Sequence, residues 1–300
     1  MAHLFEGRAN EHVEAQIDAR AEALERKLGC DLACFCGGLD QPADLEIRAA
    51  IEHRKRQGDS RGSLAFLLET DGGYIEIVER IVAVLRRHYQ HVSFIIPDHA
   101  MSAGTVLAMS GDAIFMDYHS TLGPIDPQTH REGRRGFVPA LGYLVQYERL
   151  IEKSRRGKLT AAELAFLVEK FDPAELYRYE QSRNLTIALL EEWLVKYKFK
   201  DWKETRTRKR KVTPAMRKKR ANEVARLLNA TDRWHSHARG ISMEVLRSDV
   251  NLVIDDFEED AALNQAIREY YELFSDYLMK LPFEGAIHVR GRFSPIYSAS

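Results

Sequence analysis

The stretch His99-Ala100-Met101-Ser102-Ala103-Gly104-Thr105 lies between an apolar run at residues 92–96 and small residues that continue to Gly111. This order predicts a strand, a sharp turn and a helix that begins at the serine. Ser102 would then lie beside unpaired backbone N–H groups and the positive end of the helix dipole. Two interpretations are open from this stretch alone: Ser102 is a nucleophile, or it is an ordinary N-cap residue.

Apolar runs of strand length alternate with amphipathic segments on both sides of this turn. The pattern predicts strands at residues 31–36, 64–68, 92–96 and 113–116, with helices at 12–28, 44–56, 74–88 and 103–111. Such alternation specifies an α/β layer fold with a mainly parallel sheet. Right-handed crossovers bring the loops after the strands to one edge of the sheet, where sites are usually built. Farther on, residues 250–254 predict another strand and residues 261–280 a helix.

Composition limits the classes of function. The 300 residues carry a net charge of −1, which gives no general attraction to nucleic acid or membranes. No apolar run approaches the length of a membrane span, and the first residues lack the layout of a signal peptide. The three cysteines, at 30, 34 and 36, have no metal-ligand spacing around them. We therefore expect a cytoplasmic protein without a disulfide framework, a metal site or a cofactor.

A glycine pair follows the strand expected at 64–68, in Asp71-Gly72-Gly73. Glycine at the carboxyl end of a strand frees the backbone to direct N–H groups into a cleft. If the two strands are neighbours, the N–H groups of Gly73 and Ala103 can converge beside the Ser102 hydroxyl. Two such donors next to a hydroxyl make an oxyanion hole with its nucleophile.

The chain resembles the Clp/crotonase-fold serine peptidases, and among them the serine dehydrogenase proteinases, relatives of signal peptide peptidase A. The resemblance rests on the glycine pair, on Ser102-Ala103-Gly104-Thr105 and on Leu122-Gly123-Pro124-Ile125-Asp126-Pro127-Gln128, in this order and spacing. It departs at Asp71, where relatives usually carry proline, and at Ala238, where they usually carry glycine. It extends over about residues 60–260, with a helical insertion between.

The resemblance implies a ClpP/crotonase-like layered fold and hydrolysis of peptide bonds, with Ser102 as nucleophile and Gly73 and Ala103 as oxyanion donors. It also implies a homo-oligomer, and membrane association only through a partner. Gly72, His119 and Asp126 are candidates for the substrate cleft. We expect an N-terminal helix at 1–29, a catalytic core at 30–158 and 233–280, a helical insertion at 159–232 and a C-terminal tail at 281–300.

The general base is less clearly indicated. The resemblance implies a lysine some fifty positions after the serine, and Lys153 is the first lysine after Ser102. A lysine acts as a base only as the neutral amine, so it has to be desolvated. Helical periodicity instead puts Lys153 opposite the apolar face of its helix. Lys158, His99 and His119 are alternatives, and a neighbouring subunit could supply the cover that Lys153 lacks.

Other features have structural explanations. His235 and His237 alternate around Ser236, but no third metal ligand is evident, so a structural role is favoured. The basic run at 206–220 lacks interleaved aromatic residues. We interpret it as a solvated helical face rather than a surface that binds nucleic acid. Two other functions are open on the same scaffold: a crotonase-type acyl-CoA enzyme, and a scaffold or regulatory protein without a working base.

Overall fold

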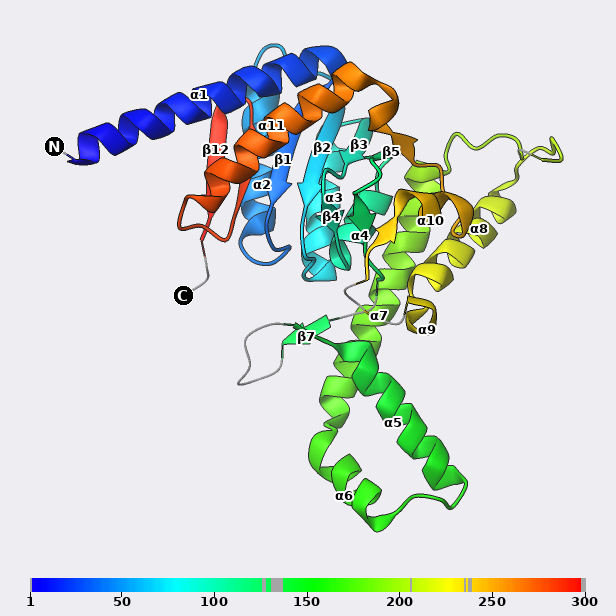
Figure 1. Ribbon diagram of the computed structural model, residues 1–300. Coiled ribbons are helices and arrows are strands. Elements are labelled where there is room, and N and C mark those ends of the chain that lie inside the picture. The colour runs from blue at the N-terminus through cyan, green and yellow to red at the C-terminus, as the bar shows by residue number, and fades with distance from the viewer. Residues whose placement is uncertain are drawn as a thin grey trace.

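A seven-stranded sheet forms the centre of the computed structural model, which describes residues 2–125, 128–130, 137–205, 207–234, 236 and 239–297 (Figure 1). The strand order is β10-β5-β3-β2-β1-β11-β12; neighbours from β10 to β1 are parallel, and β11 and β12 are antiparallel. The bounds are β1 Asp31–Cys36, β2 Ser63–Glu69, β3 His91–Ile95, β5 Ala113–Met116, β10 Asp255–Asp256, β11 Gly285–Val289 and β12 Arg292–Ile296. The expectation of an α/β fold with a mainly parallel sheet is confirmed.

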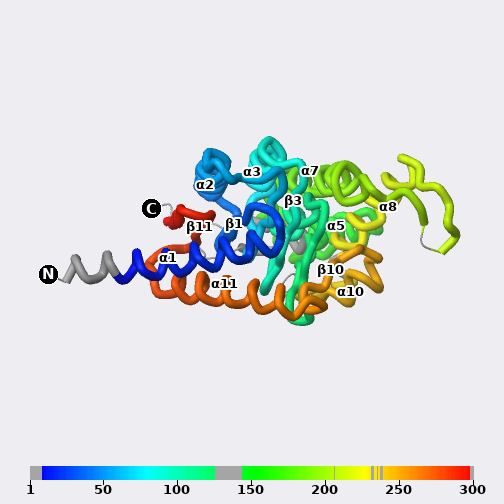
Figure 2. Tube along the Cα trace, turned by 90° about the horizontal axis from the view of Figure 1, so that it is seen from above, coloured from blue at the N-terminus to red at the C-terminus, as the bar shows by residue number. Residues whose placement is uncertain are grey.

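Helices cover both faces of the sheet (Figure 2). One face packs against α2 (Ala43–Arg56), α3 (Ile75–His88) and α4 (Ala103–Met109), and the other against α1 (Ala2–Leu28) and α11 (Ala261–Met279). Side chains of β1 alternate between these two cores: Phe35 faces the first, and Cys34 faces the second. Because both faces are buried, the parallel strands read in the sequence as continuous apolar runs.

The two ends of the sheet differ from expectation. Residues 250–254 form no strand; pairing with β5 begins only at β10, after Ile254. The expected tail at 281–300 instead contains β11 and β12, which extend the sheet beyond β1. His288 hides the apolar pattern of β11, yet it is buried because its ring bonds to the Tyr270 hydroxyl (2.8 Å) and to Asp18 (3.0 Å).

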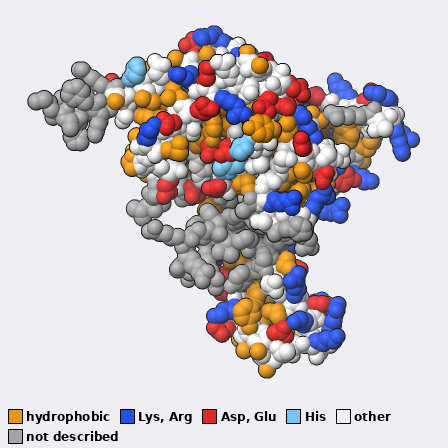
Figure 3. All heavy atoms as spheres, viewed as in Figure 1, with side chains coloured by type: hydrophobic (Ala, Val, Ile, Leu, Met, Phe, Trp, Pro, Cys, Tyr) orange, Lys and Arg blue, Asp and Glu red, His pale blue; other side chains and the backbone are white. Residues whose placement is uncertain are grey.

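A helical arm that begins at residue 140 extends away from the central sheet (Figure 1). It consists of α5 (Ala140–Arg155), α6 (Ala161–Lys170) and the first half of α7 (Pro173–Trp193), so it includes α5, which the expected core boundary at 158 assigns to the core. Leu144, Leu176 and Tyr179 form its own small cluster. Apolar side chains of α6 and α7 are exposed on it (Figure 3).

After α7 the chain returns to the first core. A π-helical turn, η1 (Leu194–Lys198), continues α7 and is followed by α8 (Pro214–Leu228), α9 (Thr231–Trp234), α10 (Met243–Ser248) and the 3₁₀ turn η2 (Phe257–Glu259). Short strands complete the fold: β4 (His99–Ala100), β6 (Thr121–Leu122) and β9 (Ile241–Ser242) in one small sheet, β7 (Gln128–His130) and β8 (Phe137–Pro139) in another. Among the described helices, none combines the length and apolar character needed to span a bilayer.

Candidate active site

Ser102 occupies a strained turn between β4 and α4. Its backbone has φ 50° and ψ −116°, a conformation that residues other than glycine rarely adopt. The side chain makes no hydrogen bond to the first turn of α4, although the serine holds the N-cap position. Only 6% of the residue is exposed. Ser102 therefore lacks the hydrogen bond that defines an ordinary N-cap serine, and its hydroxyl is left for another use.

Backbone hydrogen bonds hold this turn against two neighbouring segments. The Thr70 N–H donates to the His99 carbonyl (3.1 Å), and the Met101 N–H donates to the Thr70 carbonyl (2.8 Å). On the other side, the Gly123 N–H donates to the Ala100 carbonyl (3.1 Å) and to the Thr105 hydroxyl (2.9 Å). The ends of β2 and β6 thus fix the turn from both sides.

Gly72, the first residue of the glycine pair, lies directly against the serine. A Cβ built on Gly72 would lie 2.9 Å from the Ser102 Cβ and 3.5 Å from the Ala103 nitrogen. Gly72 has φ +106° and Gly73 has φ +155°. Gly72 therefore lies against Ser102 and Ala103, and Gly73 follows it in the chain.

The orientation of Gly73 follows from its pairing with Leu39. The Leu39 N–H donates to the Gly72 carbonyl (2.8 Å), and the Tyr74 N–H donates to the Leu39 carbonyl (2.9 Å). Successive peptide groups of an extended chain point to opposite sides, so the N–H of Gly73 is directed away from Leu39. A Cβ on Gly73 would lie 2.2 Å from the Leu39 oxygen, which leaves room for glycine alone.

Gly123 is a site residue that sequence reasoning missed. A Cβ there would lie 3.0 Å from both the Met101 Cα and the Ser102 nitrogen. Gly123 belongs to the motif Leu122-Gly123-Pro124. This motif indicated a family resemblance, but it did not indicate a contact with Ser102. Gly72 and Gly123 therefore enclose the backbone of Ser102 from two sides, and close backbone approach is the reason for glycine at both.

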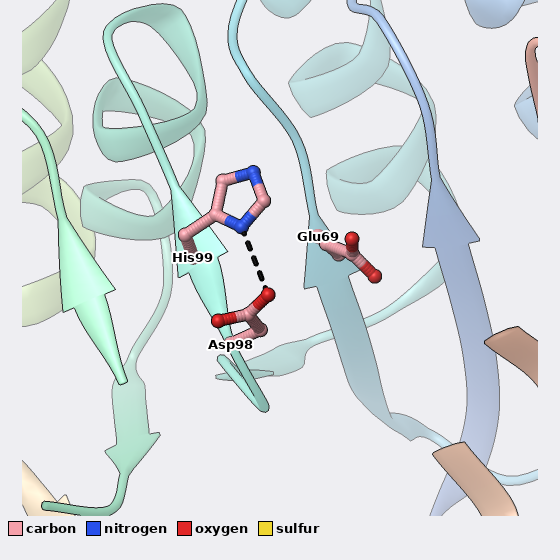
Figure 4. A group of neighbouring side chains, drawn as sticks. All are labelled: Glu69, Asp98 and His99. Carbon is pink, nitrogen blue, oxygen red and sulfur yellow. Dashed lines mark hydrogen bonds and ion pairs between the residues drawn. The ribbon is translucent and has the colours of Figure 1, made fainter. Parts of the chain in front are cut away.

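A cleft of about 810 Å³ opens beside this turn and is lined by Gly72, Met101 and several charged side chains. His99 lies in it, with its Nε2 3.1 Å from Asp71 Oδ1 and its Nδ1 3.2 Å from Asp98 Oδ2 (Figure 4). The hydrogen bond that His99 donates to Asp71, supported by the one to Asp98, outweighs burial and raises the pKa of His99 to about 9. The same bond lowers the pKa of Asp71. Both ring nitrogens of His99 are bonded to carboxylates, and neither is bonded to Ser102.

Three side chains of this cleft, Glu69, Asp98 and His99, offer ligand atoms within 4.8 Å of one another (Figure 4). These atoms already have partners, because Glu69 Oε2 accepts a hydrogen bond from the Tyr271 hydroxyl (2.5 Å). A metal ion would have to displace these bonds. His119 is 70% exposed, and its Nε2 lies 3.7 Å from Asp98 Oδ1. It lies near the charged residues of the cleft rather than at the serine.

The structure does not bring Lys153 to Ser102 within one chain. Lys153 is half-exposed near the end of α5, in the arm, and its Nζ lies 2.5 Å from Glu163 Oε1. Because α5 continues to Arg155, the lysine stays on the polar face that its periodicity predicts. Lys158 is exposed. Among the other sequence candidates, Asp126, His235, His237 and Ala238 lie outside the described residues.

The basic run contributes to packing at its C-terminal end. Arg217 donates to the Trp202 carbonyl (3.1 Å), and Arg220 pairs with Glu223 (3.0 Å) and donates to the Val250 carbonyl. Residues 207–211 are exposed. The solvated-face interpretation fits the exposed part, and two arginines of α8 have a structural role.

One family model matches the part of the chain that holds this site. The sequence model of the family described as ClpP-like SDH-type serine proteinase matches residues 47–145. Two uncharacterised proteins of Methanocaldococcus jannaschii are similar over short stretches. MJ1495 is 37% identical over 87 residues, and MJ0137 is 39% identical over 62 residues. These stretches cover 29% and 21% of this chain, and 28% and 22% of the two relatives.

Solved structures are similar at low sequence identity. Two mutant forms of a membrane-bound stomatin-specific protease, one of them with a substrate peptide, are 11% and 12% identical, with TM-scores of 0.42 and 0.43. These matches cover 75% and 89% of this chain, and 77% and 86% of the others. The catalytic domain of ClpP from Plasmodium falciparum is 11% identical, with a TM-score of 0.28, over 30% of this chain and 52% of that one. The resemblance to the SDH-type serine proteinases is thus confirmed by sequence over residues 47–145, the part of the chain that holds the glycine pair and Ser102.

Proposed function

We propose that this chain is a serine peptidase in which the Ser102 oxygen attacks the carbonyl carbon of a peptide bond. The observation that carries the proposal is the strained, buried turn of Ser102 between two close glycines, with a hydroxyl that does not cap its helix. Strained backbone of this kind persists only where the surroundings enforce it, and it clusters at active sites. The family match over residues 47–145 supports the same reaction.

In the proposed reaction, the N–H groups of Gly73 and Ala103 stabilise the oxyanion. Neither of these N–H groups donates a hydrogen bond to another backbone group of the described residues. The Ser102 oxygen forms a bond to the carbonyl carbon, and the hydroxyl proton passes to a base and then to the departing amine as the C–N bond breaks. Water then hydrolyses the ester. Two fixed donors at the developing charge typically supply several kcal/mol of transition-state stabilisation.

We propose that the base is a lysine from the arm of a second copy of the chain, with Lys153 as the first candidate and Lys158 as the alternative. His99 is already bonded at both nitrogens. Lys153 lies in the arm, where it pairs with Glu163, and it would have to leave Glu163 for a less solvated position to act as a base. This proposal requires a homo-oligomer.

A fluorophosphonate probe tests the nucleophile, because it labels only an activated serine. We expect labelling at Ser102, and no labelling or peptide hydrolysis in Ser102→Ala. Hydrolysis by a Ser102→Ala protein that retains its fold would contradict the proposal. A scaffold function, which the pairing of Lys153 with Glu163 favours, predicts no labelling of the unmodified protein either.

Mixed oligomers test the origin of the base. Ser102→Ala and Lys153→Ala should each be inactive alone, and should recover part of the activity when they are unfolded and refolded together. Lys170→Ala, at another lysine of the arm, is the control and should be fully active. No recovery in the mixture would place the base in the same chain as its serine.

A further inference from the structure

The cleft beside the Ser102 turn lies at the carboxyl ends of two neighbouring parallel strands. Its lining includes Cys36 at the end of β1 and Glu69 at the end of β2. Four lining side chains are acidic: Glu69, Asp71, Asp98 and Glu284. The described residues of the lining include no lysine or arginine, and His99 is the one histidine among them. Carboxylates therefore dominate the charge of this cleft.

His99 balances only part of that charge. Its ring nitrogens lie against Asp71 and Asp98 (3.1 and 3.2 Å), so one imidazolium already serves two carboxylates. Glu69 comes within 4.8 Å of both His99 and Asp98 but is hydrogen-bonded to neither (Figure 4). His119 lies 3.7 Å from Asp98 and is not part of the lining. Three carboxylates thus share one cation of the cleft.

Neutral groups hold Glu69 in place. Its Oε2 accepts hydrogen bonds from the Tyr271 hydroxyl (2.5 Å) and the Cys36 thiol (3.2 Å). Burial raises the pKa of Tyr271 and of Cys36, so both donors keep their protons. Among the described residues, none donates a hydrogen bond to Oε1. The carboxylate is therefore ordered and half-buried, and one of its oxygens is left for a ligand.

Apolar side chains line the same cleft. Leu278 and Met101 are half-buried there, and Met101 directly precedes Ser102. Lysine and arginine bury their methylene stems along apolar surface while their charged ends reach polar groups. A cleft of about 810 Å³ can hold such a side chain together with part of a peptide. An acidic side chain in the same place would meet like charges, which disfavour binding.

We propose that this cleft selects peptides that carry a lysine or arginine side chain near the scissile bond, with Glu69 as the specificity-determining residue. The stem of the basic side chain packs against Leu278 and Met101, and its charged end binds Glu69. Asp71 and Asp98, which are bonded to His99, add to the attraction. This inference rests on the proposed function of Ser102.

Arginine and citrulline peptides test the preference, because the two side chains have similar shapes and differ in charge. The probes are acetylated and amidated octapeptides of glycine and serine, with one arginine or one citrulline at each position in turn. In calorimetry, the Ser102→Ala protein should bind the best arginine peptide about tenfold more tightly than its citrulline counterpart. Equal affinities would overturn the inference.

Hydrolysis by the unmodified protein tests the proposed function separately. We expect kcat/KM to favour the arginine peptide about tenfold, because the same ion pair forms in the transition state. Cleavage of both peptides with equal kcat/KM would contradict the inference and leave the peptidase function standing. Preferential binding of the arginine peptide without cleavage of any peptide would contradict the role of Ser102 and support the cation site.

Glu69→Gln tests the assignment to one carboxylate, because glutamine keeps an oxygen for Tyr271 and Cys36 and lacks the charge. In the Ser102→Ala background it should weaken arginine-peptide binding about tenfold and leave citrulline-peptide binding unchanged. Glu79→Gln, at an exposed position of α3 outside the cleft, is the control and should change neither. Unchanged arginine-peptide affinity in Glu69→Gln would refute the role of Glu69. If that variant does not fold, the comparison of arginine with citrulline still decides the preference.

Discussion

Replacing Ser102 by glycine should stabilise the fold relative to Ser102→Ala, although both variants lack the nucleophile. Alanine keeps the Cβ and therefore the cost of φ 50°, about 1–3 kcal/mol for a residue other than glycine. Glycine removes that cost but makes the unfolded chain more flexible, which offsets about 0.4–1 kcal/mol. The expected net gain in the free energy of unfolding is about 1 kcal/mol, or about 2 °C in Tm.

Urea unfolding of the two variants at one pH measures this difference directly. The hydroxyl is absent from both proteins, so its contacts cancel and only the backbone conformation at position 102 distinguishes them. An unfolding midpoint for Ser102→Gly at or below that of Ser102→Ala would show that the turn is not strained. The main structural support for a nucleophilic Ser102 would then be lost.

Three further predictions concern the site and the core. Gly72→Ala should lower kcat about a hundredfold, because its Cβ would lie 2.9 Å from that of Ser102 and displace the nucleophile; Gly58→Ala, with no atom within 4 Å, should not. Asp71→Asn should lower the pKa of His99 from about 9 in an NMR titration, because it removes the largest of the stabilising hydrogen bonds. Arg54→Met should cost about 3–5 kcal/mol in the free energy of unfolding, because it removes the buried cation from Asp31 and leaves Glu25 only the Arg290 guanidinium, at 3.5 Å.

The sign of the pH dependence follows from the raised pKa of His99. Its stabilising effect is complete below the unfolded pKa near 6.5 and is lost as the pH rises through about 9. Solvent screens the pair, since the Asp71 side chain is 97% exposed, and screening reduces the pKa shift and the stability effect together because the two are linked. An unchanged His99 titration in Asp71→Asn would contradict the assignment.

For Arg54→Met, the exposed Arg48→Met is the control and should leave the urea midpoint unchanged.

Local sequence pattern predicted the sheet well where the strands are buried on both faces. The runs at 31–36, 64–68 and 113–116 are apolar except for Asp31, and they form β1, β2 and β5. β11 was missed because His288 interrupts its pattern, and only its distant partners Tyr270 and Asp18 explain why it is buried. Residues 250–254 look like a strand because they are apolar, yet only Asp255–Asp256 are aligned with β5.

The candidate site, too, could be predicted only in part from the sequence. Ser102 and the glycine pair could be predicted because each follows a recognisable strand. The role of Gly123 depends on contacts across a turn that the pattern does not encode. The base could not be assigned, because the position of Lys153 depends on how the arm packs rather than on its spacing from the serine.

Helix α7 joins the small apolar cluster of the arm to the core on one face of the sheet, and this connection has a consequence for hydrogen exchange. The N-terminal half of α7 contributes Leu176 and Tyr179 to the small cluster of the arm, and the C-terminal half contributes Leu190 and Trp193 to the main core. The small cluster can open while the main core stays folded, so amide protons of α5 and α6 should exchange through local opening. Amide protons at the C-terminal end of α7 should exchange only through global unfolding. Protection of the α7 amides should therefore rise from the N-terminal half of the helix, in the arm, to the C-terminal half, in the main core.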